Sequence, residues 1–126
     1  MLEYLGLPYS DKSEEVMDWR ADVSDFIFSE LSKEGRNIYA PISSAHHVAK
    51  KYGMPRNWEF WEGLDKEILS ICGKFIIVML DGWKYSVGLR AEFDIADELG
   101  LEIEYLDPTP YIQKMELIRS GIWKHK

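Results

Sequence analysis

The longest uninterrupted hydrophobic block of the chain lies at residues 75–80 and reads FIIVML. It shows no alternation between apolar and polar positions, which is typical of a strand that helices cover on both faces of a parallel sheet. Ser86 can then cap a helix. The apolar face of this helix is formed by Leu89, Phe93 and Ala96, with Glu92 at its border. Open α/β sheets bind ligands at the carboxyl ends of their strands, so the pattern predicts a site beside Glu92.

The other hydrophobic blocks follow the periods of strands and helices in turn. We expect further strands at residues 2–7, 37–40 and 101–106, and helices from residue 13 to the glycine at 35, from 57 to 73, from 86 to 100 and over 111–119. Residues 43–52 form either a short helix or an irregular turn, and residues 122–126 fray unless a neighbouring subunit holds them. The strand, helix, strand order implies right-handed parallel crossovers. The predicted fold class is therefore α/β, a flavodoxin-like doubly wound sandwich with a four- or five-stranded, mostly parallel sheet.

Composition and charge restrict the class of partner. The chain has 126 residues, which suits one domain over residues 1–126, and 46% of them are hydrophobic. The net charge of −7 disfavours nucleic acid polymers and anionic membranes as partners, because both surfaces would repel the protein. The sequence has one cysteine and neither a basic apolar leader nor a long apolar span. We therefore expect a cytoplasmic protein without internal disulfides.

Acidic residues near the predicted carboxyl edge of the sheet are the first candidates for chemistry. Asp81 ends the central strand, and Glu92 lies one turn into the next helix, behind Gly88. Asp65 lies on the preceding helix, one turn from Trp61. With 22 acidic residues in the chain, any one of them is more often a solvated residue than a catalytic one. The border position behind a glycine makes Glu92 the strongest candidate.

Two further features can bind a ligand. The helix that begins at Ser86 offers free backbone N–H groups to a phosphate, although a simple N-cap explains this serine equally well. Side chains that can stack on a base, or else fill the core, are Trp58, Trp61 and Trp83. Tyr9 follows the first strand and lies beside Glu92 if the two strands are neighbours; otherwise it is an ordinary aromatic residue of a turn.

A metal or a phosphate-binding cofactor is not expected. His46 and His47 are adjacent, so on a helix they point about 100° apart, and Cys72 has no ligand partner at the spacing of a zinc site. The chain also lacks a Gly-rich phosphate loop and a nucleophile elbow. We therefore predict no metal and no cofactor.

Two motifs resemble the nucleoside 2-deoxyribosyltransferase-like family. Residues 4–10 read YLGLPYS, which fits the pattern YxxxPYS, and residues 81–92 read DGWKYSVGLRAE, which fits DGWxxSxGxxxE. A small branch of that family shares both patterns. The resemblance extends from residue 2 to about residue 108, and the second motif is the more specific of the two.

This resemblance implies cleavage of the N-glycosidic bond of a nucleoside or nucleotide, by hydrolysis or by deoxyribosyl transfer. It makes Glu92 the nucleophile that forms a glycosyl ester, Tyr9 the residue that orients its carboxylate, and Asp65 the residue that assists the departing base. It also assigns a sugar hydroxyl to Asp81. The expected substrate-binding residues are Ser10, Trp61, Trp83, Ser86 and Gly88, of which the last two match the family's 5′-phosphate positions.

Other functions on the same fold remain open. The main alternative is a noncatalytic nucleotide-binding module that uses the same pocket. A receiver-type signalling domain needs an acidic cluster after the first strand, and a flavin-binding domain needs a hydroxyl-rich loop there; the sequence LPY at residues 7–9 supplies neither. The expected partners are thus a nucleoside or nucleoside monophosphate, and further copies of the chain in a homodimer or higher homo-oligomer.

Overall fold

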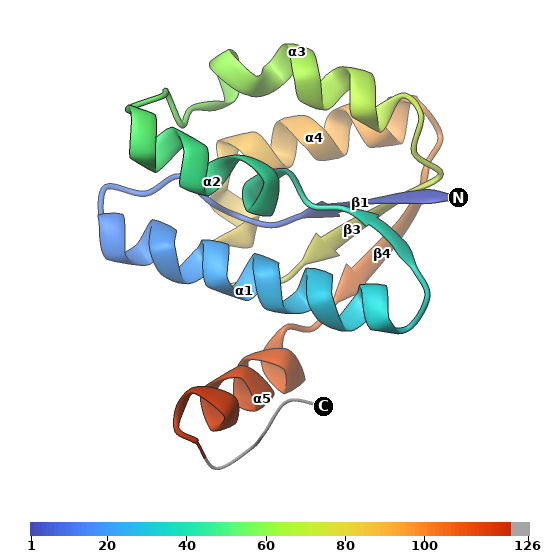
Figure 1. The fold of residues 1–126 in the computed structure, drawn as a ribbon. Helices are drawn as coiled ribbons and strands as arrows, with labels where there is room; N and C mark the ends of the chain where they lie inside the picture. Colours follow the sequence, from blue (N-terminus) through green and yellow to red (C-terminus); the bar gives the residue numbers. More distant parts are fainter. Residues whose placement is uncertain (122–126) are drawn as a thin grey trace.

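Strands and helices alternate along the chain in the computed structural model, which describes residues 1–121 (Figure 1). The strands are β1 (Leu2–Gly6), β2 (Asn37–Tyr39), β3 (Lys74–Val78) and β4 (Glu102–Leu106). The helices are α1 (Glu14–Lys33), α2 (Pro41–Tyr52), α3 (Trp58–Leu69), α4 (Val87–Glu98) and α5 (Thr109–Arg119), with a 3₁₀ turn η1 (Trp83–Tyr85) between β3 and α4.

The strands form one four-stranded sheet in the order β2-β1-β3-β4, and every neighbouring pair is parallel. The order reverses between β1 and β3, so crossover connections leave in opposite directions from these two central strands. This is the flavodoxin-like α/β arrangement predicted from the sequence, with four strands. Such a reversal opens a crevice at the carboxyl ends of the strands, where ligands bind in doubly wound folds.

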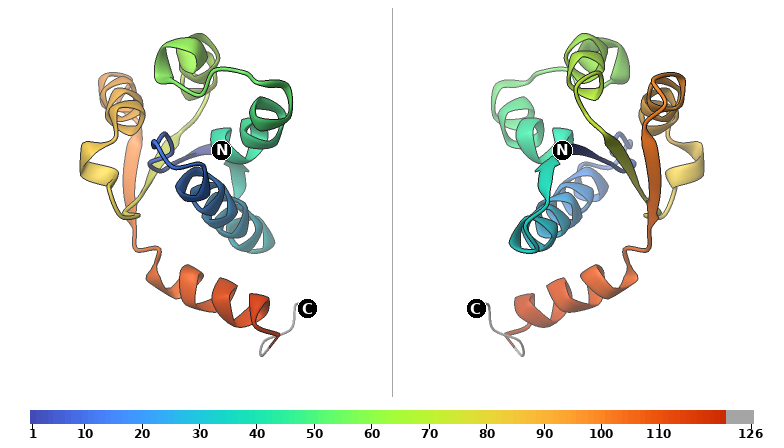
Figure 2. Two further views of the ribbon diagram at one scale, coloured as in Figure 1. Left: turned by 90° about the vertical axis from the view of Figure 1, so that its left-hand side faces the viewer. Right: turned by 90° about the vertical axis from the view of Figure 1, so that its right-hand side faces the viewer.

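The two faces of the sheet are covered by different helices (Figure 2). Alternate β1 residues point to opposite faces, so Leu5 and Leu7 pack with α1 and α5, while Tyr4 packs with α3 and α4. Gly6 also faces α3 and α4. A Cβ atom at Gly6 would lie 2.8 Å from the ring of Phe75 and 2.9 Å from Leu89, so only glycine allows β1 to pack this closely there.

Helix boundaries follow the local signals with two differences from prediction. The segment at residues 43–52 belongs to a complete helix, α2, which begins earlier because Pro41 occupies its first turn, where no backbone N–H is needed. Asn57 occupies the N-cap of α3 as expected, but its side chain makes no capping hydrogen bond. The caps predicted for α1 and α4 are present, since Ser13 accepts from the Val16 N–H and Ser86 from the Leu89 N–H. The tail predicted to fray, residues 122–126, lies outside the described residues.

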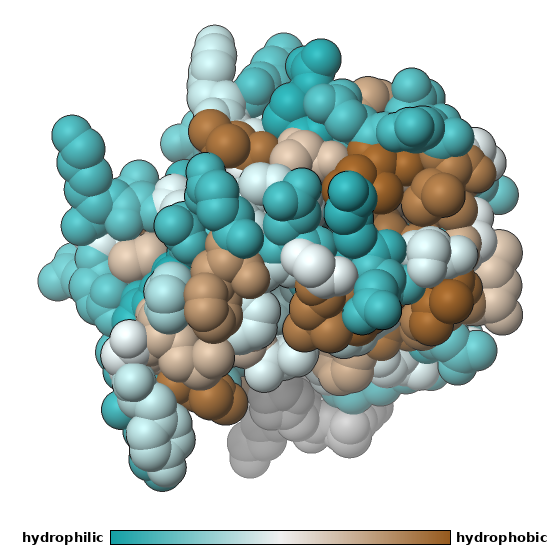
Figure 3. All heavy atoms as spheres, turned by 90° about the horizontal axis from the view of Figure 1, so that it is seen from above, coloured by the Kyte–Doolittle hydropathy of each residue, from teal (hydrophilic) through white to brown (hydrophobic). Residues whose placement is uncertain are grey.

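Some large hydrophobic side chains are left exposed on α2, α3 and the η1–α4 turn. They include Val48, Tyr52, Phe60, Leu64, Tyr85 and Val87. Figure 3 views the molecule from the side of α3 and shows hydrophobic side chains interspersed with hydrophilic ones. Among the described residues, no helix is long and apolar enough to span a membrane.

Candidate functional site

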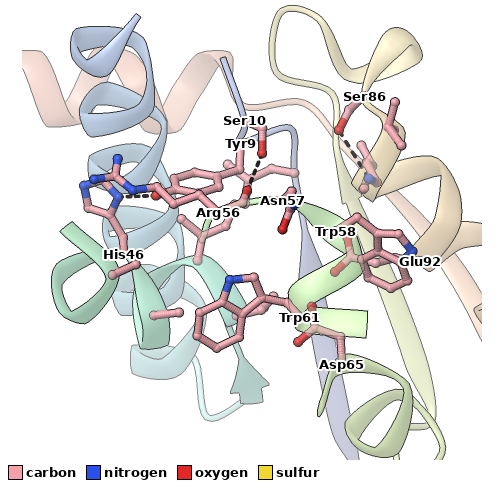
Figure 4. A pocket seen from close by; sticks show the side chains of 18 of the residues that line it. Tyr9, Ser10, His46, Arg56, Asn57, Trp58, Trp61, Asp65, Ser86 and Glu92 are labelled. Carbon is pink, nitrogen blue, oxygen red and sulfur yellow. Dashed lines mark hydrogen bonds between the residues drawn. The ribbon is translucent and has the colours of Figure 1, made fainter. Parts of the chain in front are cut away.

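A cavity of about 430 Å³ lies at the carboxyl edge of the sheet (Figure 4). The loop after β1, the helices α2 and α3, and the first turns of α4 all contribute to its lining. Residues from four separate parts of the chain therefore meet here, as the reversal in strand order requires. Its volume suits a small organic ligand.

Glu92 lies in the wall of the cavity and is the most constrained carboxyl group there. It belongs to the buried face of α4 together with Leu89 and Ala96, with only 7% of its surface exposed. The sequence had placed it at the border of that face, but Phe93 occupies the border instead. The hydroxyl of Tyr4, from the middle of β1, donates a hydrogen bond of 2.5 Å to Glu92 Oε2.

Asp65, on α3, is a second buried carboxyl group lining the same cavity. Burial raises the pKa of Asp65 to about 6, and a hydrogen bond from Tyr4 opposes that rise. Burial raises the pKa of Glu92 to about 8; the Tyr4 hydroxyl opposes this as well, whereas the charge of Asp65 adds to it. The Tyr4 hydroxyl thus influences both carboxyl groups but has a single proton, which Glu92 accepts, and the two carboxyl groups repel each other when both are ionised.

The opposite end of the cavity carries a chain of hydrogen bonds, which we call the Tyr9–His46–Asp18 chain. The Tyr9 hydroxyl lies 2.6 Å from His46 Nδ1, and His46 Nε2 lies 3.0 Å from Asp18 Oδ1. Lys50 donates to the other oxygen of Asp18 at 2.8 Å. Figure 4 shows His46, Tyr9 and Arg56 at one end of the cavity and Glu92 and Asp65 at the other.

The first turn of α4 forms a further part of the lining. Ser86 caps the helix, and Gly88 follows within the first turn. The nearest atom to a Cβ built on Gly88 is 4.0 Å away, in Trp58, so packing does not require a glycine at this position. What the glycine does is keep the backbone of this turn open to the cavity.

Two tryptophans of α3 line the cavity. Trp61 donates its ring N–H to the Pro55 carbonyl at 2.8 Å, which fixes the indole, and Figure 4 shows it between the two ends of the cavity. Trp58 lies near Glu92 in the same view. Both present aromatic surface on which a flat ligand can stack.

Three of the predicted site residues lie elsewhere than expected. The Tyr9 hydroxyl binds His46 and not Glu92, because Tyr4 projects from β1 directly toward α4. Asp81 is exposed and outside the cavity lining, since the chain turns at Gly82 with φ of 90° and the Asp81 carbonyl accepts from Arg20. Trp83 packs toward β4 against Tyr105, with ring centroids 6.1 Å apart, so it does not line the cavity.

The other six predicted residues line the cavity, and so does Tyr9 despite its different hydrogen-bond partner. The six are Glu92, Asp65, Ser10, Trp61, Ser86 and Gly88. Ser10 donates its hydroxyl to the Arg56 carbonyl at 2.7 Å, so it holds the loop before α3 in position.

Sequence reasoning missed three residues of the site. Tyr4 was visible only as the first letter of the motif at residues 4–10, inside an otherwise apolar strand. The sequence presents His46 only as a possible metal ligand, whereas in the structure it is a buried residue hydrogen-bonded to Tyr9 and Asp18. Arg56 lies in the short loop between α2 and α3, where no motif or hydrophobic periodicity marks it as a site residue. Within residues 1–121, no cluster of three or more His, Cys, Asp or Glu side chains could hold a metal ion.

The fold and cavity define a flavodoxin-like α/β domain with two coupled carboxyl groups at the carboxyl edge of its sheet. A family model described as "Domain of unknown function (DUF1937)" matches residues 2–106, which include every strand and the whole lining of the cavity. The chain therefore belongs to the DUF1937 family. No curated protein matches the sequence.

Proposed function

We propose that the protein cleaves the N-glycosidic bond of a nucleoside or nucleotide through a covalent bond between the sugar and Glu92. The observation that carries the proposal is the pair of carboxyl groups of Asp65 and Glu92 in the wall of a ligand-sized cavity, with the buried Tyr4 hydroxyl bonded to Glu92 behind them. No cation neutralises the two carboxyl groups in the interactions described. Buried, uncompensated ionisable groups in a cavity are typical of catalytic sites.

In the proposed first step, a carboxylate oxygen of Glu92 bonds to the anomeric carbon while the carbon–nitrogen bond breaks. The bonding electron pair leaves with the base, and the Asp65 carboxyl gives its proton to that base. In the second step, water or another base attacks the anomeric carbon and releases Glu92 as a carboxylate. If water attacks, its proton returns to Asp65, so both carboxyl groups recover their starting state.

Tyr4 takes the orienting role that the sequence suggested for Tyr9. Its hydroxyl hydrogen-bonds the Glu92 carboxylate and favours the ionised form, which is the nucleophilic one. At pH 7, a carboxyl with a pKa of about 8 is mostly protonated and one with a pKa of about 6 is mostly ionised. Reaction therefore needs the proton to pass from Glu92 to Asp65, and the positive charge that develops on the sugar favours that transfer.

We also propose that a nucleoside monophosphate is preferred over the nucleoside. The first turn of α4, with Ser86 and the open backbone at Gly88, offers N–H groups and the positive end of the helix dipole to a phosphate. A charge-assisted contact of this kind corresponds to roughly a ten- to hundredfold preference. Equal turnover of the two substrate forms would argue against this phosphate position.

A noncatalytic nucleotide-binding module is the second candidate, and one observation favours it. Because the pKa of Glu92 is raised to about 8, its carboxyl group is mostly neutral near pH 7 and can serve as a hydrogen-bond donor to a ligand. Such a module would bind nucleotides without releasing a base.

Incubation with a panel of nucleosides and nucleoside monophosphates distinguishes these candidates. Chromatography detects free base, and calorimetry detects binding in the same samples. Release of base that stops in Glu92→Gln supports the enzyme. Binding with no release at any pH between 5 and 9 supports the module and contradicts the enzyme.

We also propose a homo-oligomeric assembly and a cytoplasmic location. The exposed hydrophobic side chains of α3 and the η1–α4 turn, including Phe60 and Tyr85, are suited to burial between copies of the chain in a homodimer or larger oligomer. Light scattering at micromolar concentration that reports only monomer would contradict this. We propose a cytoplasmic location because nucleotides are the proposed substrates.

A further inference from the structure

The Tyr9–His46–Asp18 chain plays no part in the proposed chemistry at Glu92, yet it reaches the same cavity. Tyr9 and His46 both line the cavity, and His46 is 4% exposed. Their rings meet edge to face with centroids 5.5 Å apart, which holds the phenol against the imidazole. Because each hydrogen bond in this chain has a donor and an acceptor, the charge state of one end determines which atom donates at every step.

The direction follows from the charged end of the chain. Lys50 binds Asp18 and lowers the pKa of its carboxyl, so Asp18 is ionised at neutral pH and can only accept. His46 Nε2 must then carry a proton and donate it to Asp18. In the neutral imidazole Nδ1 is left with a lone pair, and it accepts the proton of the Tyr9 hydroxyl.

We propose that Tyr9 is a fixed hydrogen-bond acceptor, held in that state by His46 and Asp18, for an N–H group on the ring of a flat ligand. The hydroxyl proton is engaged by His46, so the phenol oxygen presents only lone pairs to the cavity. Trp61, which lies between the two ends of the cavity, supplies the stacking surface for the ring.

Arg56 extends this acceptor into a two-part recognition edge. Its Nη1 is held by Glu14 at 2.9 and 3.1 Å, and the guanidinium interacts with the Tyr9 oxygen, which leaves one lone pair of that oxygen for a ligand. A donor and an acceptor side by side match the edge of a nucleobase, which carries a ring nitrogen or carbonyl next to an N–H group. The identity of the ring as a nucleobase rests on the proposed function, whereas the acceptor state of Tyr9 does not.

The proton arrangement can be observed directly. Long-range ¹H–¹⁵N NMR of the full chain distinguishes the two neutral forms of a histidine and the doubly protonated form. We expect the neutral imidazole of His46 to carry its proton on Nε2 and not on Nδ1. A proton on Nδ1, with or without one on Nε2, would overturn the proposal, because Tyr9 would then accept from His46 and direct its own proton into the cavity.

Ligand pairs that differ by one amino group test the recognition. Calorimetry with the Glu92→Gln chain, which prevents consumption of the ligand, compares adenosine monophosphate with purine riboside monophosphate, and cytidine monophosphate with its 4-deamino analogue. We expect the amino-bearing member of at least one pair to bind roughly tenfold more tightly, and this preference to disappear in Tyr9→Phe. Tyr52→Phe, on an exposed tyrosine outside the cavity, should retain it.

Asp18→Asn should reverse the proton arrangement. Lys50 attracts the amide oxygen, so the amide NH₂ faces His46 Nε2 and the imidazole proton moves to Nδ1. The amino-bearing ligand should then lose its advantage. Asp25→Asn is the matched control, because Asp25 faces the exposed His47 across the same two helices, outside the cavity.

The outcomes separate this inference from the proposed function. If the protein prefers the amino-bearing ligands but the unmodified chain releases no base, the acceptor role of Tyr9 is supported and the proposed enzymatic function is contradicted. If the unmodified chain releases base but shows no preference within the ligand pairs, only the acceptor role of Tyr9 is overturned. If neither member of either pair binds, the assignment of the ring to a nucleobase is overturned.

Discussion

Glu3 and Glu92 are equally buried carboxyl groups with opposite surroundings. Each has 7% of its surface exposed. Glu3, on the α1 side of β1, receives three hydrogen bonds from the Arg36 guanidinium at 2.5, 3.1 and 3.4 Å. Glu92, on the other face of the sheet, has a phenol and a second carboxyl group as its neighbours.

This difference separates a structural carboxylate from a candidate catalytic one. A buried charge is tolerated when an opposite charge and hydrogen bonds replace water, as Arg36 does for Glu3. Glu92 lacks such a cation and opens onto a cavity, so its burial weakens the fold and raises its pKa. A buried carboxyl group that destabilises the fold and has no structural partner is expected where function requires it.

The largest expected difference between the two residues is in turnover. Glu92→Gln keeps the shape of the side chain but removes the attacking charge, so base release should fall by at least about a thousandfold. Glu3→Gln should retain turnover within about threefold, because Glu3 lies outside the cavity. Initial rates of base release, measured by chromatography at a temperature where both variants are folded, decide this. A Glu92→Gln chain with unchanged rates would remove Glu92 from the chemistry.

The free energy of unfolding should change in opposite directions in the variants Glu92→Gln and Glu3→Gln. The folded Glu92 holds its proton to a pH of about 8 and the unfolded group to about 4.5, so unfolding releases a proton between these values and the wild-type free energy of unfolding falls as pH rises. Glu92→Gln removes this loss and should be more stable than wild type at pH 9, by on the order of 5 kcal/mol, with little difference at pH 4. Glu3→Gln should be less stable by on the order of 2 kcal/mol, because Arg36 loses a partner.

Urea unfolding at pH 4, 7 and 9 measures both changes. A Glu92→Gln curve that lies below wild type at pH 9 would mean that the carboxylate stabilises the fold, as in an ordinary ion pair. The account of its burial would then be wrong.

The pH dependence of turnover depends on the second carboxyl group. With pKa values of about 6 for Asp65 and about 8 for Glu92, activity should peak near pH 7 and fall on both sides. In Asp65→Asn only Glu92 titrates, and its pKa should drop because the charge of Asp65 raises it. Activity of this variant should be lower but should rise with pH to a plateau, without the alkaline decline. Complete loss of activity at every pH would instead make Asp65 the nucleophile.

The smallest expected effect concerns the two serine caps. Ser86 and Ser13 cap α4 and α1 with the same geometry, accepting at 3.2 and 3.3 Å, but only Ser86 lines the cavity. Each change to alanine should cost about 1 kcal/mol of stability. Ser86→Ala alone should reduce the preference for a monophosphate over a nucleoside, by about tenfold. An equal effect of both variants on this preference would show that Ser86 acts only as a cap.

The fold was predictable because its signals are local. The apolar run at β3, the serine caps and the glycine stops each depend on a few neighbouring residues, and parallel crossovers then leave few topologies. The first turn of α2 was not predicted because a proline can follow the end of a strand or occupy the first turn of a helix. The sequence around Pro41 does not distinguish these two roles.

The site was only partly predictable because its contacts are not local. Glu92 was predicted from its position after the central strand, and Asp65 from its place on the preceding helix one turn from Trp61 and from the family resemblance. The Tyr4–Glu92 hydrogen bond joins residues 88 positions apart, and sequence pattern does not show which of two tyrosines turns toward α4. Asp81 was placed wrongly for the same reason, since the turn at Gly82 decides on which side of the edge it lies.

A covalent adduct on Glu92 is the most direct test of the central claim. A nucleotide with fluorine at C2′ slows breakdown of a glycosyl ester, so the chain can be quenched, digested and examined by mass spectrometry. We predict a mass increase equal to the fluorinated sugar phosphate on the peptide that contains Glu92, which is absent in Glu92→Gln. An adduct on the peptide that contains Asp65, or base release without any adduct in wild type under single-turnover conditions, would contradict Glu92 as the nucleophile.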